Sequence, residues 1–281
     1  MSAPRVGAAP SKTVRTIILV IAGVIFALPI YGLIEDSLRE GEPVNGAPQQ
    51  YGFQHYIDLF NPANEATYDG LFQGVQNSLV IALLTVLIVL LLLLPTMILV
   101  ELKFVRYRRL LEFICLIPIT IPTVVLVVGF IPVYSVVAQV FGSTPYTLAF
   151  AVGVIVLPYA YRPIAANLQA IDVATLSEAA RSLGAGWLGV LWRVILPNLR
   201  RGILAAVFIT VAVVLGEYTI ASFLSQNTFQ TALLLVQQTD PYAGVIFAVI
   251  ALLFAMILLL ILGRLGSSER VRRSRRKART S

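Results

Sequence analysis

Charged residues, cysteine and histidine are all scarce in this chain, and each scarcity excludes a class of protein. Asp, Glu, Lys and Arg make up 12% of the 281 residues, against 58% hydrophobic residues and a mean hydropathy of +0.86. Soluble domains carry about 25% charged residues, so an ordinary soluble protein is excluded. With Cys115 and His55 as the single residues of their kinds, no intramolecular disulfide, metal cluster or Ser-His-Asp triad can form. We therefore expect no enzymatic activity in this chain.

Long uncharged segments take up most of the sequence instead. A helix that crosses a bilayer core needs about 20 apolar residues. Six segments meet or approach this length: 17–34, 79–100, 113–141, 145–161, 202–224 and 243–263. The third is long enough to tilt or to include a break at Pro118, Pro122 or Pro132. Asp240 and Pro241 are typical of an N-cap and a first helical position, so they predict the start of the sixth helix. We expect an all-α membrane protein with six transmembrane helices.

The distribution of Lys and Arg predicts the orientation of these helices. Positive residues gather in cytoplasmic loops, and here they fall in both tails and in the second-to-third and fourth-to-fifth connections. The first connection instead holds seven acidic residues and the single base Arg39. We expect a multi-pass protein of the bacterial plasma (inner) membrane with both termini in the cytoplasm. The predicted parts are a cytoplasmic tail 1–16, a first transmembrane helix 17–34, an extracytoplasmic loop 35–76, a membrane core 77–265 and a basic cytoplasmic tail 266–281.

Both ends of the chain allow an alternative interpretation. Residues 17–34 follow basic residues, as in a secretory signal, but they exceed the roughly 7 to 15 apolar residues of a signal and no cleavage site follows. An uncleaved first helix is therefore expected. The basic residues of 266–281 could bind nucleic acid, but beside a transmembrane helix such a tail more often contacts anionic lipid. We expect membrane lipid, and no nucleic acid, as its partner.

The connection 172–197 is too polar and too rich in glycine to cross the membrane, yet too regularly patterned to be unstructured. Its first half places apolar residues at helical spacing up to Gly184, where a residue that tolerates positive φ ends a helix. Ser177 is a candidate cap in this half. The second half repeats an apolar stripe from Trp187 and ends at Pro197. We predict two short amphipathic helices that meet at Gly184.

This connection resembles the Glu-Ala-Ala signature of permease subunits from binding-protein-dependent ABC importers. The signature reads Glu-Ala-Ala, three residues, Gly, nine residues, Ile, one residue, Leu-Pro, and this chain departs from it by Val194 in place of Ile. The resemblance implies a type I importer permease with a cytoplasmic coupling helix between the fourth and fifth transmembrane helices, in a coupling loop 172–197. The implied ATPase-docking residues are Glu178, Ala179, Ala180, Arg181, Gly184, Leu196 and Pro197. The alternative is an amphipathic helix on the lipid surface, which would need a broader basic face.

The chain carries no ATP-binding motif of its own. None of Lys12, Lys103 and Lys277 follows a glycine, so no phosphate-binding loop of the Gly-Lys-Ser/Thr type is present. We expect no cofactor in this chain, with ATP and Mg bound by a partner. The resemblance implies two copies of an ABC ATPase, an extracytoplasmic solute-binding protein and a second homologous permease. We expect that permease to be a different chain, with a homodimer as the alternative.

Other classes of membrane protein fit the sequence less well. An ion-coupled secondary transporter would favour internal repeats with interrupted helices, and the sequence shows no convincing repeat. A membrane scaffold or sensor would not need the spacing between Glu178 and Pro197. Co-purification of an ATPase would distinguish the importer from both.

An acidic residue inside the fifth predicted helix, Glu217, points to a transport pathway. Ionisable residues within a membrane are costly and by default functional, and a carboxylate beside the ring of Tyr218 suits a cation. The alternative is that Glu217 marks the outer end of the helix. Residues 216–223 resemble a segment of spermidine and putrescine permeases, whose relatives carry ferric iron, thiamine or aminophosphonate. This resemblance implies a polyamine substrate, with Glu217 meeting an amine and Tyr159 and Tyr218 as ring walls.

Overall fold

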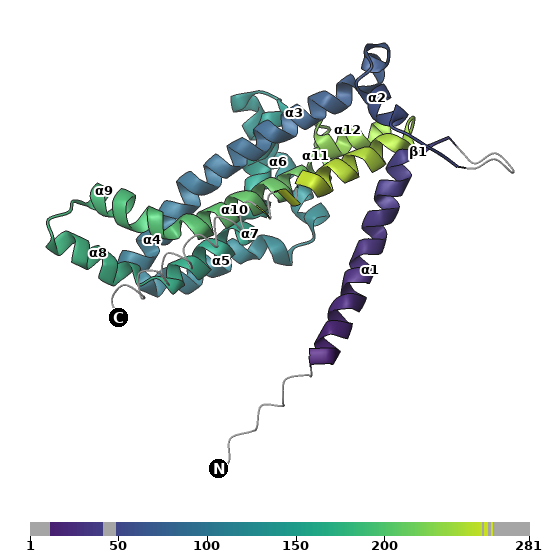
Figure 1. Ribbon diagram of the computed structural model, residues 1–281. Coiled ribbons are helices and arrows are strands. Elements are labelled where there is room, and N and C mark those ends of the chain that lie inside the picture. The colour runs from purple at the N-terminus through teal and green to yellow at the C-terminus, as the bar shows by residue number, and fades with distance from the viewer. Residues whose placement is uncertain (1–11, 42–48, 255, 258–259, 261–281) are drawn as a thin grey trace.

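The computed structural model describes residues 12–41, 49–254, 256–257 and 260, and nearly all of them are helical (Figure 1). In chain order the elements are α1 (Lys12–Leu38), β1 (Arg39–Glu40), β2 (Gln50–Tyr51), α2 (Gln54–Leu59), η1 (Pro62–Asn64), α3 (Glu65–Ile88), η2 (Val89–Leu93), α4 (Leu94–Lys103), η3 (Val105–Tyr107), α5 (Arg108–Thr120), α6 (Thr123–Phe141), η4 (Pro145–Thr147), α7 (Leu148–Ala170), α8 (Val173–Ser182), α9 (Trp187–Val190), η5 (Leu191–Ile195), α10 (Leu196–Leu215), α11 (Thr219–Phe223) and α12 (Phe229–Val236). A further helix covers Pro241–Phe254. The predicted all-α fold is confirmed.

Five of the six predicted transmembrane segments lie on helices that are long and apolar enough to cross a bilayer. These helices are Thr13–Leu38, Pro62–Lys103, Thr123–Phe141, Pro145–Ala170 and Trp187–Leu215. The sixth starts at Pro241 as predicted, because Asp240 Oδ1 accepts the backbone N–H of Tyr242 at 3.0 Å. The end of segment 243–263, most of the tail 1–16 and all of the tail 266–281 lie outside the described residues.

The third predicted segment is broken at one of the three prolines considered. Ile121 and Pro122 have extended backbones (ψ 128° and 132°) between α5 and α6. Pro118 and Pro132 lie inside α5 and α6 instead. The break separates the segment into two helices, of which only α6 reaches the length needed to cross a bilayer.

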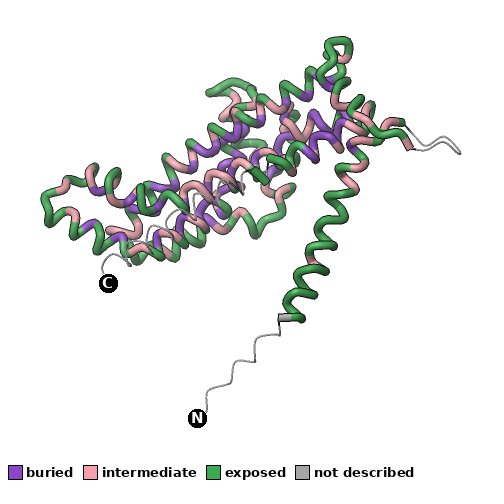
Figure 2. The backbone as a smooth tube through the Cα atoms, viewed as in Figure 1, coloured by how far each residue is buried: buried purple, intermediate pink, exposed green. Residues whose placement is uncertain are grey.

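The centre of the bundle is built from α3, α7 and α10, which pack against one another. Figure 2 shows the buried residues gathered along these helices. Gly202 permits the close approach of α10 to α7: a Cβ at this position would lie 2.7 Å from Asn167 Cβ and 2.8 Å from the carbonyl oxygen of Pro163. Small residues at helix contacts are typical of membrane bundles, where association depends on close van der Waals packing.

The described part of the connection between the first two transmembrane helices contains regular structure. α1 continues to Leu38 and stands away from the bundle (Figure 1), and β1 pairs antiparallel with β2, with Arg39 opposite Tyr51. Arg39 also forms ion pairs with Glu35 at 2.9 Å and Asp36 at 3.0 Å. α3 begins at Glu65, well before the apolar segment 79–100, so the second helix extends beyond its apolar part.

Candidate functional site

The first helix of the predicted docking loop is α8, and its start is set by Asp172. The Asp172 carboxylate accepts the backbone N–H of Thr175 at 3.1 Å and the Thr175 hydroxyl at 2.6 Å. These two hydrogen bonds, the hydroxyl contributing most, hold the pKa of Asp172 below its usual value. Ser177 does not cap the helix as the sequence suggested. It lies inside α8, buried, and its Oγ has no hydrogen-bond partner among the described residues.

The end of α8 is a Schellman turn at Gly184, as the sequence predicts. Gly184 has φ +86°, its N–H donates to the Arg181 carbonyl at 2.9 Å, and the Ala185 N–H donates to the Ala180 carbonyl at 3.1 Å. Leaving out its two chain neighbours, no atom of the described residues lies within 4 Å of a Cβ built on Gly184, so backbone conformation alone calls for glycine here.

Side chains at this turn are available to a partner. Leu183 is 88% exposed and Leu188 73% exposed, at the end of the bundle that Figure 1 labels α8 and α9. Of the predicted docking residues, Glu178, Ala179 and Arg181 are exposed and Ala180 is half-buried. The structure therefore brings these four together with Gly184 on one short exposed element.

Leu196 and Pro197 lie elsewhere, and the prediction that the second short helix ends at Pro197 is wrong. α9, η5 and α10 run on without interruption from Trp187 to Leu215. A proline can stay inside this helix because η5 is a π turn: the Leu196 N–H donates to the Leu191 carbonyl, one residue further back than in an α-helix. Asn198 Nδ2 donates to the Val194 carbonyl at 2.7 Å, which occupies an acceptor near the missing proline N–H.

The second transmembrane helix repeats this device. η2 is also a π turn, closed by the Leu94 N–H donating to the Val89 carbonyl, and Pro95 follows it. Thr96 Oγ1 donates to the Leu92 carbonyl at 2.6 Å, in the role that Asn198 has after Pro197. Both helices thus pass through a Leu-Pro pair without a break.

Trp187, which the sequence analysis placed only in an apolar stripe, contacts two cations. Lys103 Nζ, at the end of α4, lies 5.7 Å from the centre of the indole ring, and Arg181 Cζ, in the last turn of α8, lies 5.9 Å from it. Sequence spacing predicts the neighbourhood of Arg181 but carries no signal for Lys103, which comes from a distant part of the chain.

Glu217 lies in a break of the helix rather than inside it. The fifth transmembrane helix ends at Leu215, not near Leu224, and a short helix, α11, starts at Thr219. Both carboxylate oxygens of Glu217 accept the backbone N–H of Ile220 at 3.0 Å, so the side chain caps α11. A narrow cavity beside it is lined by Ser78, Ile81, Leu148, Val152, Val214, Ala221 and Thr228.

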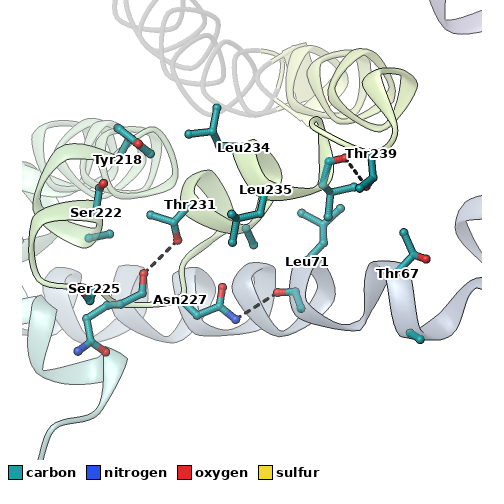
Figure 3. A pocket seen from close by; sticks show the side chains of 16 residues that line it. Thr67, Leu71, Tyr218, Ser222, Ser225, Asn227, Thr231, Leu234, Leu235 and Thr239 are labelled. Atoms are coloured by element: carbon teal, nitrogen blue, oxygen red, sulfur yellow. Dashed lines mark hydrogen bonds between the residues drawn. The ribbon is translucent and has the colours of Figure 1, made fainter.

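Tyr218 faces a larger pocket of about 690 Å³ (Figure 3). The start of α3, α11 and α12 line it, and no charged side chain of the described residues does so. Among the described residues, the hydroxyls of Tyr218, Ser222 and Ser225 make no hydrogen bond, while Asn227 Nδ2 donates to the Gly70 carbonyl at 3.2 Å. The lining residues of α3 precede the apolar segment 79–100 by roughly 12 to 20 Å of helix, so the pocket lies beyond that segment.

The three residues predicted for the pathway are therefore not gathered around one cavity of this chain. Glu217 lines the narrow cavity, Tyr218 the larger pocket, and Tyr159 neither. Tyr159 is 38% exposed on α7, about 10 Å along the helix from Val152, which lies beside Glu217. No group of three or more His, Cys, Asp or Glu in the described residues is placed to hold a metal ion.

Comparison with known proteins identifies a family for this chain. Residues 98–267 match the family described as "Binding-protein-dependent transport system inner membrane component", a range that includes α8, the Gly184 turn, α10 and Glu217. The chain is also similar to sulfate permease 2, chloroplastic, of Chlamydomonas reinhardtii, at 38% identity over 80 residues. That stretch is 28% of this chain and 21% of the permease, so the similarity covers about a fifth of the relative's length.

Proposed function

The chain belongs to the family of binding-protein-dependent transport system inner membrane components, and on that premise we propose that it forms one half of the translocation pathway of an ATP-driven solute importer. As a member of this family it is an inner-membrane transport component, and we propose that it works with an ABC ATPase and a solute-binding protein.

One observation carries the docking proposal: the exposed turn at Gly184 connects α8 to a helix that continues unbroken into α10. A partner that binds α8 and the turn therefore acts directly on the fifth transmembrane helix. We assign the contact with the ATPase to Glu178, Ala179, Ala180, Arg181 and Gly184. Leu196 and Pro197 transmit the movement, since they lie inside the continuous helix and not at the turn.

If two permeases line the pathway, each presents a docking loop to an ATPase. We propose two copies of the ATPase, which bind ATP and Mg, one against each permease, with this docking loop on the cytoplasmic side. The second permease is a related but different chain, and a homodimer is the alternative. The solute-binding protein meets the opposite end of the bundle, where α2 and α12 lie (Figure 1).

A polyamine is the substrate we propose, with Glu217 as the residue that meets an amine. The support is a half-buried carboxylate beside a cavity, whose two oxygens accept backbone N–H groups at the start of α11 and which no cation among the described residues pairs with. Tyr218 and Tyr159 act as ring walls only if the partner permease brings their surfaces to the same pathway. Ferric iron, thiamine and aminophosphonate are alternatives within the same architecture.

An oxyanion is the second candidate substrate, on two separate observations. The relative with 38% identity is named as a sulfate permease. Among the described residues, the pocket of about 690 Å³ offers unengaged hydroxyls and no carboxylate, a lining that suits an anion better than a polycation.

Purification of the tagged full-length chain from its native membrane tests the assembly. We expect an ATPase, a second permease and a solute-binding protein to co-purify, and proteoliposomes of the complex to take up solute with ATP and without an ion gradient. Uptake driven by an ion gradient in the absence of ATP would instead establish a secondary transporter and refute the proposal.

Uptake of radiolabelled spermidine and of sulfate by the same proteoliposomes tests the substrate. We expect Glu217→Gln to lower spermidine uptake by about tenfold or more, equivalent to roughly 1.4 kcal/mol or more, with assembly unchanged. Glu112→Gln is the matched control, since Glu112 is exposed on α5, and it should stay within about twofold. Sulfate uptake that survives Glu217→Gln and falls with Ser222→Ala would establish the oxyanion instead.

A further inference from the structure

The indole of Trp187 is the place where the docking segment meets the second transmembrane helix. Lys103 Nζ and Arg181 Cζ lie 5.7 Å and 5.9 Å from its ring centre, both within the roughly 6 Å at which an aromatic ring attracts a cation. Lys103 is the last residue of α4, Arg181 belongs to the last turn of α8, and Trp187 is the first residue of α9. One ring therefore joins three helix ends.

We propose that Trp187 is a positioning residue that ties α8 to the end of α4, so that displacement of α8 moves the second transmembrane helix together with the fifth. This inference rests on the proposed function, because it assumes that an ATPase displaces α8. The fifth helix needs no such tie, since α9 continues into α10 through the backbone. α4 is reached only by side-chain contact, and α8 packs against both α4 and η5.

The surroundings of the ring favour this role over ordinary core packing. Trp187 is 42% exposed, so its ring is not enclosed by apolar side chains. In the part of the chain that the structure describes, neither Lys103 nor Arg181 makes an ion pair or a side-chain hydrogen bond, so the indole is the partner of both cations. The contact therefore depends on cation–π attraction and not on the apolar volume of the side chain, and variants can distinguish the two.

The experiment compares variants of Trp187 in the complete transporter reconstituted in proteoliposomes, with solute transported per ATP hydrolysed as the readout. Trp187→Phe keeps an aromatic ring, and Trp187→Leu keeps only apolar bulk. We expect Trp187→Leu to lower the transport per ATP at least fivefold while the amount of co-purifying ATPase stays within about twofold of wild type. Trp187→Phe should retain at least half of the wild-type ratio.

Two further sets of variants complete the test. Trp192→Leu is the matched control, because Trp192 is 67% exposed and no cation lies over its ring among the described residues, and it should stay within about twofold. Lys103→Gln should reproduce the loss of Trp187→Leu, Lys103→Arg should not, and the double variant should be no worse than Trp187→Leu alone. Lys103 is exposed, so these variants carry the test even if Trp187→Leu fails to fold.

The outcomes separate this inference from the function on which it rests. A wild-type chain that recruits no ATPase overturns both. A coupled wild type in which Trp187→Leu keeps its transport per ATP, or in which Trp192→Leu loses as much, overturns the role of Trp187 alone. Losses from Lys103→Gln and Trp187→Leu that multiply in the double variant also overturn it, because residues acting through one contact are not additive.

Discussion

Substitution of Gly184 probes the proposed docking turn through its backbone conformation alone. The residue has φ +86°, and among the described residues other than its chain neighbours nothing lies within 4 Å of a Cβ built there, so the added Cβ meets no steric clash with them. An L residue in the left-handed region costs about 1 to 2 kcal/mol, less for Asn and more for a β-branched residue. Because the turn is exposed, the free chain relieves this strain by opening the turn, and binding of the ATPase must restore it.

The expected size of the effect follows from this cost. At about 1.4 kcal/mol per tenfold change, a strain of 1 to 2 kcal/mol weakens ATPase binding by roughly 5- to 30-fold. We expect affinity to fall in the order Gly, Asn, Ala, Val. The assay is titration of the purified ATPase onto the purified permease, immobilised through a tag.

The order of affinities among the variants distinguishes a requirement for positive φ from a requirement for a small side chain. Asn is far larger than Ala, so an Asn variant weaker than Ala would indicate a contact limited by side-chain size rather than by φ. Affinities of Ala and Val equal to wild type would show that the turn is not needed in this conformation. Gly186→Ala is the control, because Gly186 has φ −70°, which any residue adopts, and it should bind within about twofold of wild type.

Two further predictions concern other positions with unusual backbone or packing, and both are read from thermal unfolding of the purified permease in detergent. Gly202→Ala should destabilise the permease by about 1 to 3 kcal/mol, because its Cβ would lie 2.8 Å from the Pro163 carbonyl oxygen. Gly189→Ala is the control and should not lower the unfolding midpoint, since no atom of the described residues lies within 4 Å of a Cβ built there. Equal midpoints for the two variants would contradict the close contact of α7 and α10. Ser225→Gly should raise stability by up to about 1 kcal/mol, since Ser225 has φ 51° in a Schellman turn closed by the Gln226 N–H on the Ala221 carbonyl; a lower midpoint would mean that the serine side chain stabilises the turn.

The positions of five apolar helices and the Gly184 turn could be predicted without coordinates. Each depends on a short stretch of chain: transfer of an apolar segment into lipid is favourable whatever it packs against, and a left-handed residue at a helix end calls for glycine wherever that helix lies. The Asp240-Pro241 start of the sixth helix was predictable for the same reason. The family was expected from the resemblance of the segment around Glu178 and Gly184 to a permease signature, and the family match supports it.

Helix ends were predicted less well, because the effect of a proline or a glutamate on a helix depends on which hydrogen-bond partners the surrounding residues offer. A proline such as Pro197 would by itself be expected to end a helix. Here the π turn and the Asn198 side chain supply hydrogen bonds to the Leu191 and Val194 carbonyls, and the helix continues to Leu215. Glu217 looked like a residue inside a transmembrane helix, and its carboxylate instead caps α11 after a break.

What the sequence by itself determined about this protein is its class: an all-helical membrane protein with a glycine turn at Gly184, because hydropathy and turn chemistry are local properties. Only the tertiary structure decided which side chains meet. It brought Lys103 to Trp187 across a large separation in sequence and left Glu217, Tyr218 and Tyr159 in different surroundings. Such contacts depend on the rotation and crossing of whole helices, which are set by packing between segments that are distant in the chain.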